Sequence, residues 1–175
     1  HGLVNDAVYA IGEDVHGDIW LGTMGGASRY NGQGVVGNAP GTGQSARARM
    51  DSSDSELFAH FTSANGLPHD WISAMTRDRR GPLWFATYGG GISRYDGQTF
   101  NNLTSAEGLA QNGTTAIVQD RRGHLWIGTG GGVSRYDGLV FQNLTRRDGL
   151  AGSLVTALLE DQSGDMWIAT ASGLT

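Results

Sequence analysis

The sequence predicts an all-β protein of the β-propeller class, built from four-stranded antiparallel blades. The main observation is a repeat, because one pattern of landmarks occurs four times along 175 residues. Counted from the first glycine of each unit, an aspartate lies at +12, a glycine at +15, a tryptophan at +18 and a threonine at +21. Small sheets of about 40 to 45 residues, each with an aromatic residue at a fixed place, are typical of propeller blades. The aspartates are Asp14, Asp78, Asp120 and Asp161, and the tryptophans are Trp20, Trp84, Trp126 and Trp167.

The composition agrees with short strands joined by many turns. The chain has 29 glycines, no cysteine and a net charge of −5. The lack of cysteine excludes disulfides and thiolate sites. It is compatible with an oxidising compartment but does not prove one. The negative charge argues mildly against nucleic acid or an anionic membrane as a partner. No segment approaches the ~20 apolar residues of a membrane span, and the N-terminus lacks the pattern of a signal peptide.

Each unit contains the signals for four strands in order. The first is a short apolar run rich in β-branched residues, such as Thr114–Ile117. An Asp-x-x-Gly turn follows, in which the aspartate can bind backbone amides and the glycine supplies a positive φ. The second strand carries the tryptophan, and the small residue two positions later, such as Gly22, would let a neighbouring sheet approach closely. A glycine-rich turn leads to a third strand ending in Ser-Arg-Tyr, and a hairpin signal precedes a fourth strand that begins with phenylalanine.

The four repeated tryptophans are predicted to be core residues. A lone four-stranded sheet buries too little apolar surface to be stable, so each tryptophan should pack against the next blade. Burial of a tryptophan contributes about 2–3 kcal/mol. Each Trp→Ala change is therefore expected to cost roughly 3–5 kcal/mol of stability.

The units span residues 2–65, 66–107, 108–148 and 149–175. The first contains an insertion at 34–56, rich in Gly, Ser, Ala and Asp, which predicts a mobile loop. Its acidic residues lack the ligand spacing of a calcium loop, so a solvated acidic loop is favoured. The fourth unit stops before its Ser-Arg-Tyr strand, which leaves about 3.6 blades. We therefore expect this single propeller segment to belong to a larger propeller or to be completed by another chain.

The landmarks resemble those of a known repeat. From Gly66 to Gly97 the motifs Gly-Leu, Asp-x-x-Gly-x-Leu-Trp and Gly-Gly-Ile-Ser-Arg-Tyr-Asp-Gly follow one another as in the two-component regulator propeller repeat. The resemblance covers the chain outside the insertion, and it departs at the insertion, at the unfinished last unit and at Asn31. It implies seven-bladed propellers, typically in the extracytoplasmic sensor region of bacterial hybrid histidine kinases, where many bind carbohydrate-derived signals. A periplasmic or secreted location is implied by the resemblance alone, and the repeat also occurs in other secreted proteins.

Candidate ligand-binding residues lie in loops that differ from unit to unit. In the usual propeller topology, the loops entering the first strand and those joining strands two and three share one face around the axis, here called the loop face. The segment His69-Asp70-Trp71 beside Tyr88 offers an aromatic platform and polar groups suited to a sugar or small polar ligand. The alternative is that these are ordinary polar loop residues. The loop-face residues are Asn5, Asp6, Met24, His69, Asp70, Trp71, Tyr88, Gln111, Asn112 and Ser153.

The Asp-x-x-Gly turns and the insertion should lie on the opposite face, here called the turn face. His16 and His124 adjoin these turns and are expected in solvent. The five histidines show no paired ligand spacing and no carboxylate partner, so neither a metal nor another cofactor is expected. The glycine runs lack the lysine and the following helix of a phosphate loop.

Two further motifs are explained by the repeat itself. The Ser-Arg-Tyr serines Ser28, Ser93 and Ser134 recur in every visible unit, so they are interpreted as frame residues, and the adjoining arginines should pair with carboxylates or stack on aromatic rings. Three Asn-x-Thr triplets fit the N-glycosylation pattern, two of them simply because the repeat places them there. These triplets begin at Asn102, Asn112 and Asn143.

Three functions remain open from the sequence. The favoured one is a non-enzymatic, sensor-like extracytoplasmic module that recognises a small polar or carbohydrate-derived ligand, or a protein partner, on the loop face. The second is a propeller lyase or hydrolase, similar to the streptogramin-inactivating lyases that use a histidine and an acid with a divalent metal, with its site completed by blades absent from this sequence. The third is a structural repeat protein whose partners are other propeller blades or chains at its open edges.

Overall fold

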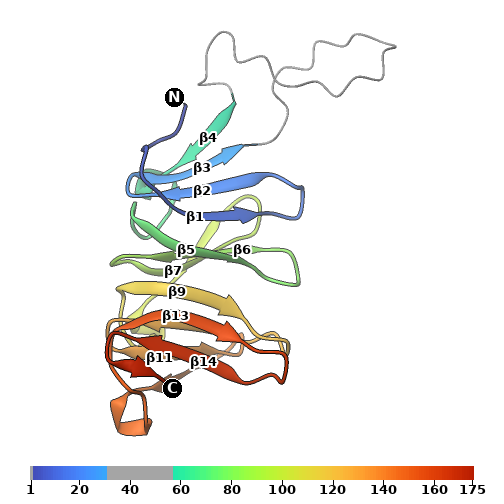
Figure 1. Cartoon of the computed structure of the whole chain (residues 1–175). Coiled ribbons are helices and arrows are strands. Elements are labelled where there is room, and N and C mark those ends of the chain that lie inside the picture. The colour runs from blue at the N-terminus through green and yellow to red at the C-terminus, as the bar shows by residue number, and fades with distance from the viewer. Residues whose placement is uncertain (1, 31–56) are drawn as a thin grey trace.

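The computed structural model describes residues 2–30 and 57–175, so the predicted loop at 34–56 lies outside the described residues. Its strands form four antiparallel sheets, each with its strands in chain order (Figure 1). The predicted all-β blade architecture is confirmed. The sheets are blade 1, β1 (Val8–Glu13), β2 (Ile19–Thr23), β3 (Gly26–Tyr30) and β4 (Phe58–Phe61); blade 2, β5 (Ile72–Arg77), β6 (Leu83–Thr87), β7 (Gly91–Tyr95) and β8 (Phe100–Leu103); blade 3, β9 (Thr114–Gln119), β10 (Leu125–Thr129), β11 (Gly132–Tyr136) and β12 (Phe141–Leu144); and blade 4, β13 (Val155–Glu160), β14 (Met166–Thr170) and β15 (Gly173–Leu174).

The blades stack face to face in sequence order, with their first strands side by side (Figure 1). Strand β5 contacts β1 on one side and β9 on the other, and β9 contacts β13. Short 3-10 turns at Ser63–Asn65, Ser105–Glu107 and Arg146–Asp148 lead from one blade to the next. Blade 4 begins its third strand with β15, so the chain reaches two residues further into that strand than the sequence pattern predicts.

The repeated aspartate organises the turn between the first two strands of each blade. In blade 1 the Asp14 carboxylate accepts hydrogen bonds from the indole Nε1 of Trp20 at 2.9 Å and from the backbone amides of His16 and Asp18 at 2.9 and 3.1 Å. Asp120 and Asp161 bind their own tryptophans at 2.9 Å, and Asp78 binds Trp84 at 3.5 Å. The aspartate therefore joins the turn to the ring that fills the core.

These contacts predict acid-sensitive folding. Burial by itself raises the pKa of Asp14, but the hydrogen bonds from Trp20 and from the two amides outweigh it and hold the pKa below its ordinary value of 3.8. For Asp120, burial is likewise outweighed, and hydrogen bonds from Trp126 and His124 lower the pKa. A carboxyl whose pKa is lower in the folded state contributes stability above its unfolded pKa and loses it as the pH falls through the folded pKa. The free energy of unfolding should therefore be flat near neutrality and decline below about pH 4.

Urea titrations at a series of pH values measure this decline. The variant Asp14→Asn should be less stable at pH 7 and should show a shallower loss between about pH 4 and pH 2. Equal slopes in the two proteins would contradict the assignment of acid sensitivity to this turn.

The recurring serines hold the third strand to the fourth, as their interpretation as frame residues requires. Ser93 Oγ donates to Asn102 Oδ1 at 2.6 Å, while the Asn102 amide donates to the carbonyl of Gly66 at 3.0 Å. Ser134 and Asn143 repeat this arrangement in blade 3. In blade 1, His60 stands in the asparagine's place, with its Nδ1 3.0 Å from Ser28 Oγ. Two of the three Asn-x-Thr triplets thus place their asparagine amides in the blade frame.

Aromatic and aliphatic side chains fill the spaces between blades. The Trp20 ring is fully buried and lies 4.8 Å from the ring of Phe61, 5.3 Å from Phe85 and 5.1 Å from Tyr95, of which the last two belong to blade 2. Trp84 is also buried and meets Tyr136 of blade 3, whereas Trp126 is only half-buried. Trp167 is 45% exposed. The prediction that every repeated tryptophan packs against a following blade is therefore wrong for Trp167, because no described sheet covers that side of blade 4.

Glycine at +20 permits the closest approach between blades, as predicted. A Cβ atom placed on Gly22 would lie 2.6 Å from Ile72 Cγ2, and one on Gly128 would lie 2.6 Å from Val155 Cγ1. The corresponding residue of blade 2 is Ala86, and the residue of blade 3 at the position of Ile72 is Thr114.

Candidate functional site

The predicted loop-face residues include an aromatic cluster, defined here as Tyr9, Trp71 and Tyr88. The rings of Trp71 and Tyr88 stack with centroids 4.4 Å apart and an interplanar angle of 29°. Tyr9 of β1 lies 5.8 Å from Trp71 and directs its hydroxyl to the sulfur of Met24 at 3.3 Å. Tyr9 is 52% and Tyr88 54% exposed, so the cluster presents aromatic surface to solvent at the junction of blades 1 and 2.

Backbone contacts hold the cluster in place. The amide of Tyr88 donates to the carbonyl of Trp71 at 2.9 Å, which joins the loop before β5 to the turn after β6. The amide of Trp71 donates to Nδ1 of His69 at 3.0 Å. The His69 ring also lies against Gly89, where a Cβ atom would approach it to 3.4 Å. His69 is exposed, so its remaining ring nitrogen is available beside the aromatic cluster.

Other predicted site residues have roles in the frame. The Asp70 carboxylate accepts a hydrogen bond from the amide of Ser63 at 2.6 Å, and the Asn112 side chain accepts one from Ser105 at 2.7 Å. Both side chains therefore hold the 3-10 turn that precedes them. Asn5 accepts from the amide of Ala7 at 2.9 Å, and Asp6 is exposed near the start of blade 1. The structure thus separates His69, Trp71 and Tyr88 from the loop-bracing residues Asn5, Asp70 and Asn112.

Sequence reasoning missed Tyr9 because it considered loops and not strands. A signal was present, since the residues at the corresponding position +7 of the other units are Ser73, Thr115 and Thr156. Ser73 Oγ donates to the carbonyl of Thr114 at 2.7 Å and Thr115 Oγ1 to that of Val155 at 2.6 Å, so the small hydroxyl side chain links neighbouring blades. Tyr9 departs from this pattern and contributes its ring to the cluster instead.

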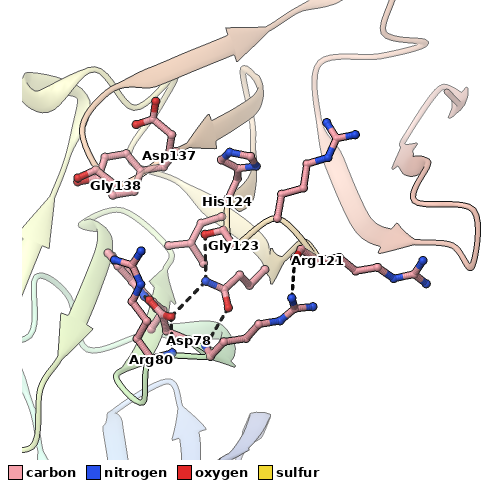
Figure 2. Close-up of a pocket in the computed structure, with 13 residues that line it drawn as sticks. Asp78, Arg80, Arg121, Gly123, His124, Asp137 and Gly138 are labelled. Atoms are coloured by element: carbon pink, nitrogen blue, oxygen red, sulfur yellow. Dashed lines mark hydrogen bonds between the residues drawn. The ribbon is translucent and has the colours of Figure 1, made fainter.

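The turn face contains cavities that the sequence did not predict. A cavity of about 280 Å³ lies between the Asp-x-x-Gly turns of blades 2 and 3, with Asp78 and Arg80 on one side and His124, Asp137 and Gly138 on the other (Figure 2). A second, of about 500 Å³, adjoins Trp126 and Arg135 between blades 3 and 4. A third, of about 510 Å³, lies beside Val15 and Arg77.

His124 differs from its predicted state. We expected a solvated histidine without a carboxylate partner, but the ring is half-buried and its Nδ1 lies 3.0 Å from Asp120 Oδ2. The Arg135 guanidinium lies 3.0 Å from the same ring and 5.9 Å from the centroid of Trp126. The Ser-Arg-Tyr arginines were expected to pair with carboxylates or to stack on aromatic rings. Arg135 stacks on Trp126 in blade 3, and Arg29 forms an ion pair of 3.5 Å with Asp18 in blade 1.

The described residues contain neither a metal-binding cluster nor a membrane-spanning helix. Across 2–30 and 57–175, no three histidine, aspartate or glutamate side chains gather closely enough to ligate a metal ion. No helix in this part of the chain has the length and apolar character needed to cross a membrane.

The repeat units coincide with a known protein family. The family described as "Two component regulator propeller" matches residues 2–25, 66–89, 108–131 and 149–172, together more than half of the chain. The chain belongs to this family. No curated protein sequence is a significant match to this propeller chain.

Solved structures with the same fold include extracellular domains of a putative two component system and a putative one component system. The extracellular domain of the putative hybrid two component system BT3049 from B. thetaiotaomicron is 22% identical, with a TM-score of 0.78 over 98% of this chain and 22% of that one. The extracellular domain of the putative one component system BT4673 from the same organism is also 22% identical, with a TM-score of 0.70 over 95% of this chain and 23% of that one. The propeller chain thus spans less than a quarter of the length of each.

An enzyme is also among the structural neighbours. The virginiamycin B lyase from Staphylococcus aureus is 16% identical, with a TM-score of 0.60 over 97% of this chain and 54% of that one. At this identity the likeness shows a shared propeller fold.

Proposed function

We propose that this two component regulator propeller chain is part of the sensor region of an extracytoplasmic protein and binds a small polar, carbohydrate-derived ligand without transforming it. The observation that carries the proposal is the exposed aromatic cluster on the loop face. Family membership and the extracellular domains among its structural neighbours support the sensor-like role and the location.

The chemistry of the cluster suits a saccharide. Tyr9 and Tyr88 expose ring surface on either side of Trp71, so the apolar face of a sugar ring can stack there. His69 supplies a polar ring nitrogen beside them, and Tyr9 and Tyr88 supply hydroxyl groups. A few polar groups placed around an apolar platform fix the orientation of a small ligand. The cluster joins two blades, so a ligand stacked on it would contact both.

Glycan-array binding followed by calorimetry tests the proposal. The wild-type chain is expected to select a restricted set of oligosaccharides, and Trp71→Ala should weaken the affinity about tenfold or more, because it removes the central ring. His69→Ala should weaken binding less. Leu139→Ala is the matched control, since Leu139 is 87% exposed in the hairpin between β11 and β12 and should leave binding unchanged.

Saccharide binding that survives Trp71→Ala would remove the loop-face site. A tightly held metal ion together with Mg²⁺-dependent lyase activity would replace the sensor proposal with the enzymatic alternative.

A further inference from the structure

The turn-face cavity between blades 2 and 3 contains residues that the repeat does not require. The two residues between the aspartate and the glycine of each turn differ from unit to unit: Val-His in blade 1, Arg-Arg in blades 2 and 3, and Gln-Ser in blade 4. Two neighbouring turns therefore place four guanidinium groups beside one cavity of about 280 Å³. Such local variation on a repeated frame marks positions that are free to acquire a specific role.

The first arginine of each pair links its turn to the next blade. The Arg79 guanidinium donates to the carbonyl of Arg121. Arg121 in turn donates to the carbonyls of Asp161 and Gln162 at 2.9 and 2.6 Å. Arg79 and Arg121 thus bridge three successive turns, and this structural role accounts for them.

The second arginine of each pair has no such role. Within residues 2–30 and 57–175, the guanidinium groups of Arg80 and Arg122 make no hydrogen bond or ion pair; only their backbone amides are engaged, by Asp78 and Asp120. Both residues are exposed and line the cavity, and Arg122 also lines the second cavity, beside Trp126. Figure 2 shows Arg80 across from His124.

The carboxylates that line the cavity are already engaged. Asp78 Oδ1 accepts from the Arg80 amide at 2.8 Å and from Gln119 Nε2 at 3.2 Å. Asp137 Oδ1 accepts from the amides of Leu139 and Val140, and these bonds lower the pKa of Asp137. The lining has four arginines against two aspartates, and one of the four, Arg121, is paired with Glu160 at 3.9 Å, so the remaining excess of charge is positive in a chain whose net charge is −5.

We propose that this cavity binds a tetrahedral oxyanion group, a phosphate or sulfate ester carried on a small molecule, between Arg80 and Arg122. A guanidinium presents paired donors that match the oxygens of a phosphate or sulfate. The guanidinium groups of Arg80 and Arg122 have no competing partner among the described residues. The Tyr136 hydroxyl donates to the carbonyl of Gly138 at 2.9 Å and forms the neighbouring wall of the cavity. The site is separate from the aromatic cluster, so it does not depend on the proposed saccharide site.

Nuclear magnetic resonance titrations of the whole chain test the proposal at constant ionic strength, set with sodium chloride. The probes are inorganic phosphate, inorganic sulfate, glucose 6-phosphate, glucose 6-sulfate and glucose. We expect saturable shifts of the Arg80 and Arg122 Nε–H signals with the esters and none with glucose. Stronger binding of the esters than of the inorganic ions would identify a carried group as the ligand; equal binding would identify the free ion.

Variants distinguish binding at this site from non-specific attraction of anions to exposed arginines. Arg80→Gln and Arg122→Gln should each weaken ester binding about tenfold, because each removes a charged hydrogen-bond donor. Arg146→Gln removes an exposed arginine from the 3-10 turn after β12 and should have no effect. Trp71→Ala should also leave ester binding unchanged, which distinguishes this site from the loop-face proposal. Absence of saturable binding, or equal weakening by Arg146→Gln, would overturn the proposal.

Discussion

Replacing Trp20 with alanine is expected to lower the free energy of unfolding by about 4–5 kcal/mol, near the upper end for a large core residue. The indole is fully buried between blades 1 and 2 and is surrounded by the rings of Phe61, Phe85 and Tyr95. Removal of the ring leaves a cavity that strands hydrogen-bonded on both sides cannot close, and it leaves Asp14 without its indole partner. Urea unfolding followed by circular dichroism measures the loss.

The equivalent substitution at Trp167 provides a matched control. Trp167 donates to Asp161 at 2.9 Å, the same distance as Trp20 to Asp14, so both variants lose a similar hydrogen bond. Trp167 is 45% exposed, however, and no described sheet covers it. We expect Trp167→Ala to cost about 2 kcal/mol, half or less of the loss at Trp20. Similar losses in the two variants would contradict the assignment of the larger Trp20 loss to packing between blades.

The substitution Gly22→Ala is expected to destabilise the chain by about 2 kcal/mol although it adds only a methyl group. The new Cβ atom would lie 2.6 Å from Ile72 Cγ2 and 2.9 Å from Ile72 Cβ, so β1–β2 and β5 must move apart. Blade 2 already has alanine at this position, Ala86, and the residue of blade 3 that corresponds to Ile72 is Thr114. The combination of residues, and not the methyl group alone, should therefore determine the cost.

A double-mutant cycle with Ile72→Ala tests this explanation. In the Gly22→Ala background this second change removes Ile72 Cγ2, the atom nearest to the new Cβ. The two changes should therefore be less destabilising together than the sum of their separate effects, by about 1 kcal/mol or more. Additive effects would mean that the blades do not meet through these two side chains.

The sequence predicted most of the frame because the frame is repetitive. The Asp-x-x-Gly turn, the tryptophan and the small residue at +20 each have a local or next-blade role that recurs in every unit, so one physical explanation serves four times. The recurring serines were recognised as structural for the same reason. A pattern of this kind cannot indicate which copy is buried, and the prediction therefore treated Trp20 and Trp167 alike.

The candidate sites depended on contacts between units. Sequence placed Trp71 and Tyr88 in neighbouring loops, and Tyr9 broke the +7 pattern, but this break did not show that a ring from the first strand of another blade completes the cluster. It also could not separate Asp70, which braces a 3-10 turn, from the exposed His69 beside it.

By itself, the sequence determined the blade, since strand period, turn chemistry and the repeated aspartate–tryptophan pair act over short distances along the chain. Only the tertiary structure decided which side chains remain available for binding. Arg79 and Arg80 are adjacent and chemically identical, yet the next turn occupies one guanidinium and leaves the other beside a cavity. The physical reason is that availability depends on what a neighbouring blade places within hydrogen-bond distance, and the order of residues within one unit does not contain that information.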